Sequence, residues 1–174
     1  MPGCSVASNS QPEADLIDLP PSTRTELSVN RKFEFSVVST SNWQTPNSRG
    51  VLVEINSGKR KIIWQQNLPQ QYGPRFILPS DSGQVLLLDD WLNIKSAQAI
   101  YIIHPFSGSK TAYSFDQIIK QSGFSASTLT AHARYGSWWI AGMPSLEKGG
   151  NIAVIPVAKR NIVVDLNTGK LLIR

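Results

Sequence analysis

The chain has few of the residues that form disulfides and metal sites. It has 174 residues, with one cysteine, Cys4, and two histidines, His104 and His132. A disulfide bond within the chain is therefore excluded. A zinc site needs three or four His, Cys or carboxylate ligands, usually with a close pair, and the sequence has no close His or Cys pair. We expect neither a bound metal nor a cofactor.

Long apolar segments are also missing. No run approaches the roughly 20 apolar residues that a helix needs to cross a bilayer. No apolar segment follows Met1, as it would in a secretory signal. Read literally, the sequence predicts a cytoplasmic protein without a transmembrane segment.

Charged residues are scarce, and their balance is positive. They make up 17% of the chain against 41% hydrophobic residues, and the formal net charge is +5. This composition can form a core and argues against disorder throughout. Residues 1–31 hold two arginines and four acidic residues, so the remainder carries +7. Such a surplus fits either ordinary solvation or an anionic partner.

Recognised catalytic motifs are absent. The sequence has neither a Gly-x-Ser-x-Gly element nor a phosphate-binding Gly-x-x-x-x-Gly-Lys loop. The adjacent carboxylates Asp89 and Asp90 could support acid–base chemistry with a nearby histidine if one of them were buried. A hydrolase therefore stays an alternative, although a turn or cap is the commoner role for such a pair.

The chain divides into two parts by composition. Residues 1–31 are rich in Ser, Pro, Asn and Thr and poor in apolar residues, which predicts a flexible tail or linker. From residue 32 onward, short runs of β-branched and aromatic residues alternate with turn residues. We expect one β domain over residues 32–174.

Cys4 has a second interpretation. The Gly3-Cys4-Ser5 segment and the polar stretch after it resemble the processing site and tether of bacterial lipoproteins. The resemblance implies that Cys4 is acylated and that the protein is an envelope-anchored lipoprotein involved in assembly. The chain departs from the motif at Pro2 and lacks an upstream apolar segment. The alternative is a free cysteine in a tail, and membrane contact is expected only if Cys4 is acylated.

Within the β domain, turn residues separate pairs of short apolar runs, as in β-hairpins. The first predicted strand covers residues 33–40. The predicted hairpins pair residues 51–55 with 61–64, 76–78 with 84–88, 100–103 with 111–115, 137–140 with 151–155, and 162–166 with 170–173.

One segment departs from the β pattern. Residues 114–121 begin with the capping residue Ser114, carry Asp116 in the first turn and Lys120 in the last, and precede Gly123. These signals predict one short helix. Its core-facing residues should be Phe115, Ile118 and Ile119.

Two hairpins share a motif. Residues 54–59 read Glu-Ile-Asn-Ser-Gly-Lys and residues 165–170 read Asp-Leu-Asn-Thr-Gly-Lys. Both resemble the blade motif of quinoprotein-like β-propellers, which implies an arrangement of antiparallel blades. No residues match the ligands of the quinone cofactor. The length allows about three blades, whereas propellers usually have about four to eight. The expected fold is therefore all-β, with antiparallel hairpins forming partial propeller-like sheets or a β-sandwich, and one short helix.

Tryptophan is abundant, with five in the chain. Adjacent residues of a strand face opposite ways, so Trp138 and Trp139 cannot share one core layer. Either one is exposed beside Arg134 and Tyr135 as a ligand or partner contact site, or both are buried in a two-sided strand. The basic run at residues 59–61 is short and fits a solvated turn, which argues against nucleic acid as a partner.

These observations favour a non-catalytic binding or scaffolding β domain that contacts a protein or polymer. The repeated hairpins, the surplus of tryptophan and the predicted tail support this interpretation. The hydrolase and the envelope lipoprotein stay as alternatives.

Overall fold

The computed structural model describes residues 18–147 and 149–174, which form three antiparallel sheets of four strands each. The first sheet contains β1 (Thr23–Leu27), β2 (Phe33–Ser39), β3 (Ser48–Asn56) and β4 (Lys59–Asn67). The second contains β5 (Pro74–Pro79), β6 (Val85–Asp90), β7 (Ile100–His104) and β8 (Ser109–Tyr113). The third contains β9 (Ser145–Leu146), β10 (Ile152–Val157), β11 (Arg160–Asp165) and β12 (Leu171–Ile173).

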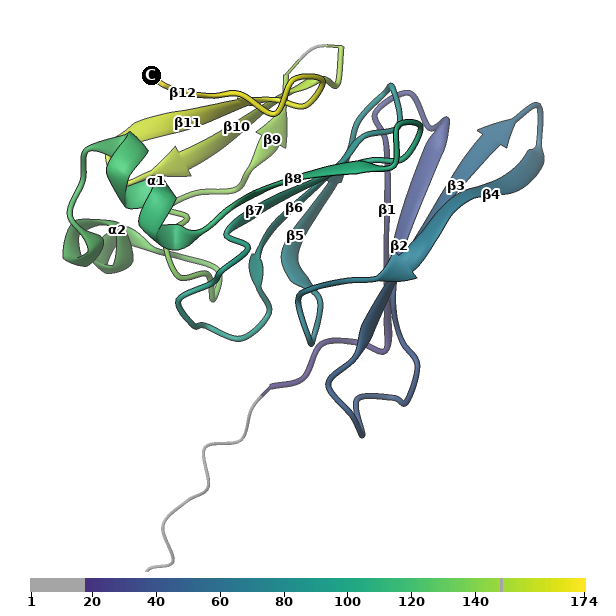
Figure 1. Cartoon of the computed structure of the whole chain (residues 1–174), viewed down its shortest axis with the longest axis horizontal. Helices are drawn as coiled ribbons and strands as arrows, with labels where there is room; N and C mark the ends of the chain where they lie inside the picture. The colour runs from purple at the N-terminus through teal and green to yellow at the C-terminus, as the bar shows by residue number, and fades with distance from the viewer. Residues whose placement is uncertain (1–17, 148) are drawn as a thin grey trace, which may run out of the picture.

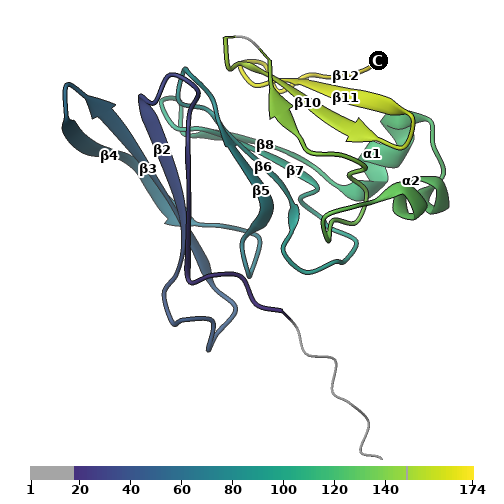
Figure 2. The same ribbon diagram turned by 180° about the vertical axis from the view of Figure 1, so that it is seen from behind.

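Within each sheet, the strands lie in the order of the sequence. The three sheets stand side by side with the second in the middle, as Figure 1 and the reverse view in Figure 2 show. The prediction of an all-β fold built from antiparallel hairpins is confirmed.

The middle sheet is buried on both of its faces. Along β6, Val85 and Leu87 pack in a core with the first sheet, whereas Leu86 and Leu88 pack in a core with the third. Side chains of a strand alternate between faces, so a strand between two cores must be apolar at every position. This explains why residues 85–88 form a continuous apolar run instead of alternating with polar residues.

The first sheet begins earlier in the sequence than expected. β1 lies inside residues 1–31, the predicted tail, and pairs with β2 along its full length. Most of its side chains are exposed, so the strand has no apolar pattern that could identify it. Residues 1–17 lie outside the described part of the chain.

Most of the predicted hairpins are present. The β3–β4 hairpin turns through Ser57 and Gly58, with φ of 48° and 78°. Positive φ at both central residues is the geometry of the tight turns that match strand twist. The pairs β5–β6, β7–β8 and β11–β12 also form as predicted.

The hairpin predicted between residues 137–140 and 151–155 is wrong. β10 pairs with β9 and β11 instead, and residues 137–140 form a loop. The Ser137 hydroxyl explains the difference: it accepts the Ile140 N–H at 3.1 Å, and its single hydrogen faces the carbonyl oxygens of Arg134 and Ile140, 2.8 and 3.0 Å away. These local bonds satisfy backbone groups that a strand would need for pairing.

Two short helices follow β8. α1 (Phe115–Ser122) is the predicted helix, and Ser114 caps it in a capping box with Gln117. The sequence predicts no helix at α2 (Ala126–His132), where the structure forms one. Only Leu129 of α2 is buried, so the segment lacks the periodic apolar face that identifies a helix.

Candidate functional site

The first strands of the three sheets line one groove of about 370 Å³. β1, β5 and β9 each pair on one side only, because each is the edge strand of its own sheet. The groove contains residues 24, 26, 27 and 29 from β1 and the turn after it, residues 75–79 from β5, and residues 143–146 around β9. We call this the central groove. It brings unpaired strand edges together, and such edges are places where an extended chain can add.

The walls of the central groove are largely apolar. Phe76 and Leu78 of β5 and Leu146 of β9 are partly buried against the core between the second and third sheets. Val29 and Met143 expose 71% and 59% of their surface. An exposed apolar surface enclosed by three strands is typical of a binding site more than of a solvated face.

Two arginines stack on one tryptophan at one end of the groove. The guanidinium carbons of Arg24 and Arg75 lie 4.7 and 4.1 Å from the centroid of the Trp91 ring. Arg24 also donates to the carbonyl oxygens of Pro74 and Arg75, and Arg75 donates to the carbonyl oxygen of Trp91. These contacts tie β1 to the second sheet. We call the three side chains the arginine–tryptophan cluster.

The cluster carries a concentration of positive charge. Burial and the nearby charge of Arg75 together lower the pKa of Arg24 to about 10, against the nearby charge of Glu26. Burial also lowers the pKa of Arg75, against the nearby charges of Asp89 and Asp18. Within residues 18–147 and 149–174, neither arginine forms a salt bridge, and the buried Nε of Arg75 has no hydrogen-bond partner. The cluster can therefore attract an anionic group.

Asp89 lies beneath this cluster and is fully buried. One of its carboxylate oxygens accepts the backbone N–H of Trp138 at 2.5 Å, and the other has no partner in the described part of the chain. Burial is the main cause that raises the pKa of Asp89 to about 7; the hydrogen bonds from the backbone of Trp138 and Asp90 and the charge of Arg75 oppose it. Burial likewise raises the pKa of Asp90.

The loop after α2 covers Arg75 from the other side. A Cβ atom on Gly136, which has φ of 70°, would lie 2.9 Å from the guanidinium carbon of Arg75. The left-handed φ favours glycine at this position. The loop after α2 therefore contacts Arg75, and the backbone N–H of its Trp138 donates to Asp89.

The two histidines make other contacts. His104 is the last residue of β7, and its Nε2 lies 3.3 Å from the hydroxyl of Thr111. Asp89 lies near the opposite end of β7, where its backbone N–H donates to the carbonyl oxygen of Ala99. His132 has its Nδ1 2.8 Å from the carbonyl oxygen of Thr128. The structure does not bring either histidine into a hydrogen bond with Asp89 or Asp90. Among the residues described, no group of three His, Cys, Asp or Glu could hold a metal ion.

The predicted aromatic site is divided by the structure. Trp139 has no exposed surface and is the buried member of its pair. Trp138 is partly buried, with its ring edge-on to Phe115 at 6.4 Å. Arg134 is exposed, and Tyr135 is 55% exposed and edge-on to Phe76 at 6.5 Å. Since Phe76 lines the central groove, Tyr135 lies next to it. Cys4, the predicted lipidation site, lies outside the described residues.

The sequence did not indicate the arginine–tryptophan cluster. Arg24 falls in the predicted tail, and Arg75 and Trp91 are far from it along the chain. The only local signal was the position of Trp91 directly after Asp89 and Asp90. Their association depends on how the first two sheets pack, which local patterns do not encode.

No protein-family model matches the chain, and no curated protein matches it. Along the described ranges, 18–147 and 149–174, no helix has the length and apolar character to cross a membrane.

Proposed function

We propose that the chain is a non-catalytic binding domain whose central groove holds an extended segment of a partner protein. The observation that carries the proposal is the convergence of three edge strands on one partly apolar groove, at whose end lie two arginines that form no salt bridge with any described residue. The edges offer backbone hydrogen bonds, and the walls offer apolar contact. The arginines offer a place for one carboxylate, from an Asp or Glu side chain or a chain terminus.

The mixed character of the groove favours a polypeptide over a polyanion. A polyanion is held by many cations along its backbone, but the groove has its arginines at one end and also contains Glu26. Most of its remaining walls are apolar, which suits the side chains of an extended peptide. Nucleic acid fits this groove poorly for the same reason.

The test begins with a selection of linear peptides of random sequence, displayed on phage, against the purified chain. We expect enrichment of peptides that combine apolar residues with at least one Asp or Glu. A labelled peptide from the enriched pool should then bind the chain in solution, as measured by fluorescence anisotropy.

Variants assign that binding to the central groove. V29D and M143D place a carboxylate at exposed groove positions and should weaken binding of the enriched peptide at least tenfold. I94D is the matched control, because Ile94 is also exposed, at 48%, and lies outside the groove. Equal affinities for all three variants, or a selection without enrichment, would contradict the proposal.

A further inference from the structure

The outer face of the first sheet has an apolar centre. Phe33, Phe35 and Val37 point into the core, so the alternate residues of β2 face outward. On the same outer face, Val53 of β3 lies opposite Ile62 of β4. Ile62 exposes 58% of its surface.

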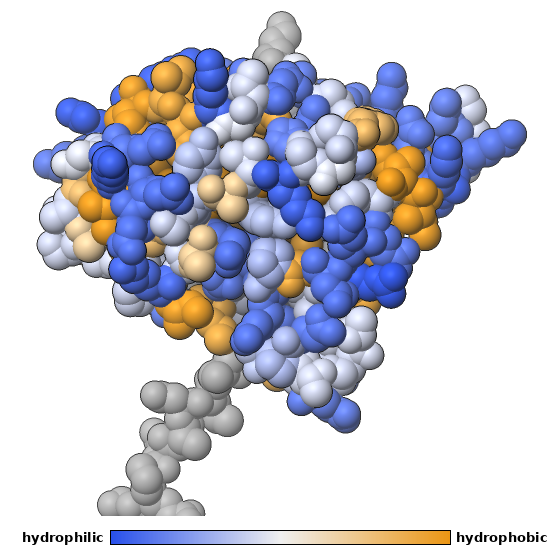
Figure 3. All heavy atoms as spheres, viewed as in Figure 1, coloured by the Kyte–Doolittle hydropathy of each residue, from blue (hydrophilic) through white to orange (hydrophobic). Residues whose placement is uncertain are grey.

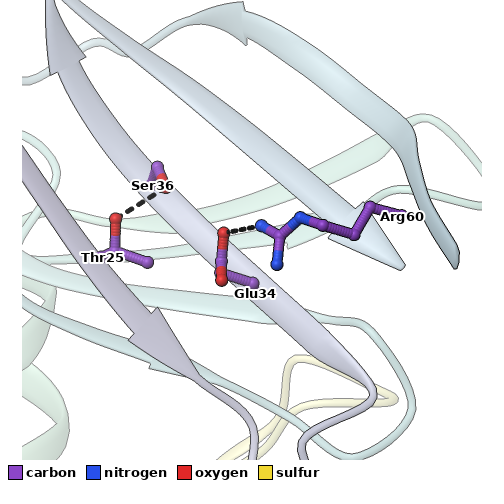
Figure 4. Close-up of polar contacts among 4 residues, drawn as sticks. All are labelled: Thr25, Glu34, Ser36 and Arg60. Carbon is purple, nitrogen blue, oxygen red and sulfur yellow. Dashed lines mark hydrogen bonds and ion pairs between the residues drawn. The ribbon is translucent and has the colours of Figure 1, made fainter. Parts of the chain in front are cut away.

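Polar pairs border this apolar centre. Figure 4 shows the hydroxyls of Thr25 and Ser36, 2.8 Å apart, and the ion pair between Glu34 and Arg60. An apolar centre within a polar border is the usual composition of a protein interface.

The outer face of the third sheet has the same character. Ile162 and Val164 of β11 point into the core, so Val163 faces outward, although its neighbours leave only 4% of its surface exposed. Val154 of β10 and Leu172 of β12 lie opposite Val163 on either side, which makes a row of three apolar residues across the sheet. Leu172 exposes 65% of its surface, and the ion pair between Arg174 and Glu147 has its atoms 3.1 Å apart. Figure 3 shows apolar surface over this sheet at the upper left, bordered by polar side chains.

The same packing step is repeated within the chain. The first sheet packs on one face of the second, and the third sheet packs on the other face. Along the chain, each sheet packs on the face of the preceding sheet that is still uncovered. The stack ends at both sides with a face that no other sheet of the described chain covers.

We infer that two copies of the chain close into a ring of six sheets, in which the first sheet of each copy packs on the third sheet of the other. A second copy fits both ends at once, because it supplies a first sheet for one exposed face and a third sheet for the other. Six four-stranded sheets lie within the usual range of about four to eight blades for a closed β-propeller. A two-fold axis makes the two contacts identical.

Charged residues of both signs lie on the two faces. The ion pairs are Glu34 with Arg60 on the first sheet and Glu147 with Arg174 on the third, and the outer face of the first sheet also carries Arg49, opposite Val38. Residues of opposite sign can therefore meet across the contact. The ring also closes the central groove into a channel that both copies line.

The test is the mass of the full chain in solution, measured by size-exclusion chromatography with light scattering at concentrations from about 1 to 100 μM. We expect twice the chain mass of 19.2 kDa. I62D and L172D should each shift the chain to the monomer, with at least a tenfold weaker dimer, whereas I94D should leave the dimer unchanged. Circular dichroism checks that each variant is folded.

A mixture of the two variants separates the ring from other dimers. An I62D chain and an L172D chain together keep one unaltered contact, between the first sheet of L172D and the third sheet of I62D. The mixture should therefore recover a dimer that neither variant forms alone. If only one of the two substitutions disrupts the dimer, the same sheet of both copies forms the contact, and this result would overturn the ring. So would a monomeric wild type at 100 μM, or a ladder of larger species. Because no ligand is present, this result is independent of peptide binding in the groove.

Discussion

The buried carboxyl group of Asp89 should make the stability of the domain depend on pH. Its pKa is raised from 3.8 to about 7, mainly by burial, so the folded state holds a proton that the unfolded state releases. Between about pH 4 and pH 7 the folded state therefore binds more protons, and the free energy of unfolding falls as the pH rises. The domain should therefore lose roughly 4 kcal/mol of stability between about pH 4 and pH 7, at about 1.4 kcal/mol for each pH unit.

The D89N variant removes this ionisation and keeps an oxygen that can accept the Trp138 N–H. At pH 4 it should be about as stable as the wild type. At pH 8 it should be more stable, by a difference on the order of 4 kcal/mol. The measurement is urea denaturation, followed by tryptophan fluorescence, of both proteins at pH 4, 5, 6, 7 and 8.

The comparison between the two proteins isolates Asp89 from the other titrating groups. Burial also raises the pKa of Asp90. Asp90 is present in both proteins, so its effect on the difference in stability cancels to first approximation. If the stabilities of D89N and wild type stay parallel across the whole range, Asp89 does not change its ionisation on folding. The account of its burial would then be wrong.

Three further substitutions test the packing. W139A should lower the free energy of unfolding by about 3–5 kcal/mol, because it removes a fully buried aromatic side chain. W138A should lower it less, since Trp138 is partly exposed. Urea denaturation compares the two variants, and equal losses of stability would contradict the assignment of Trp139 as the buried member. R24A removes the contacts that tie β1 to the second sheet and should expose residues near β1 to limited proteolysis while the rest resists. R31A, at an exposed position outside β1, is its control, and equal cleavage of both variants would count against the role of Arg24.

The sequence was most informative where local chemistry determines the structure. Ser114 and Gly123 predicted both ends of α1, because capping and left-handed conformations depend on residues next to the helix. The Asn-Ser-Gly turn likewise predicted the β3–β4 hairpin. The continuous apolar run at residues 85–88 predicted a strand, although the two cores that require it lie in distant parts of the sequence.

The sequence was least informative where contacts between sheets determine the structure. β1 has mostly exposed side chains, and it is held by pairing with β2 and by Arg24. Residues 137–140 looked like a strand because they are aromatic and apolar, but the hydroxyl of Ser137 holds them as a loop. The central groove combines three strand edges that are separated by about 50 residues or more, so no local pattern predicts it.

The interaction between a ligand carboxylate and Arg75 is the most direct test of the proposed binding site. A double-mutant cycle would combine R75Q with replacement of the acidic residue of the selected peptide by its amide, and would measure all four affinities by fluorescence anisotropy. If the carboxylate lies at the arginine–tryptophan cluster, the two changes should be coupled by about 1–3 kcal/mol. Each change would then weaken binding in the wild-type background and have little effect after the other. Independent effects that simply add would show that the carboxylate binds elsewhere and would contradict the proposed site.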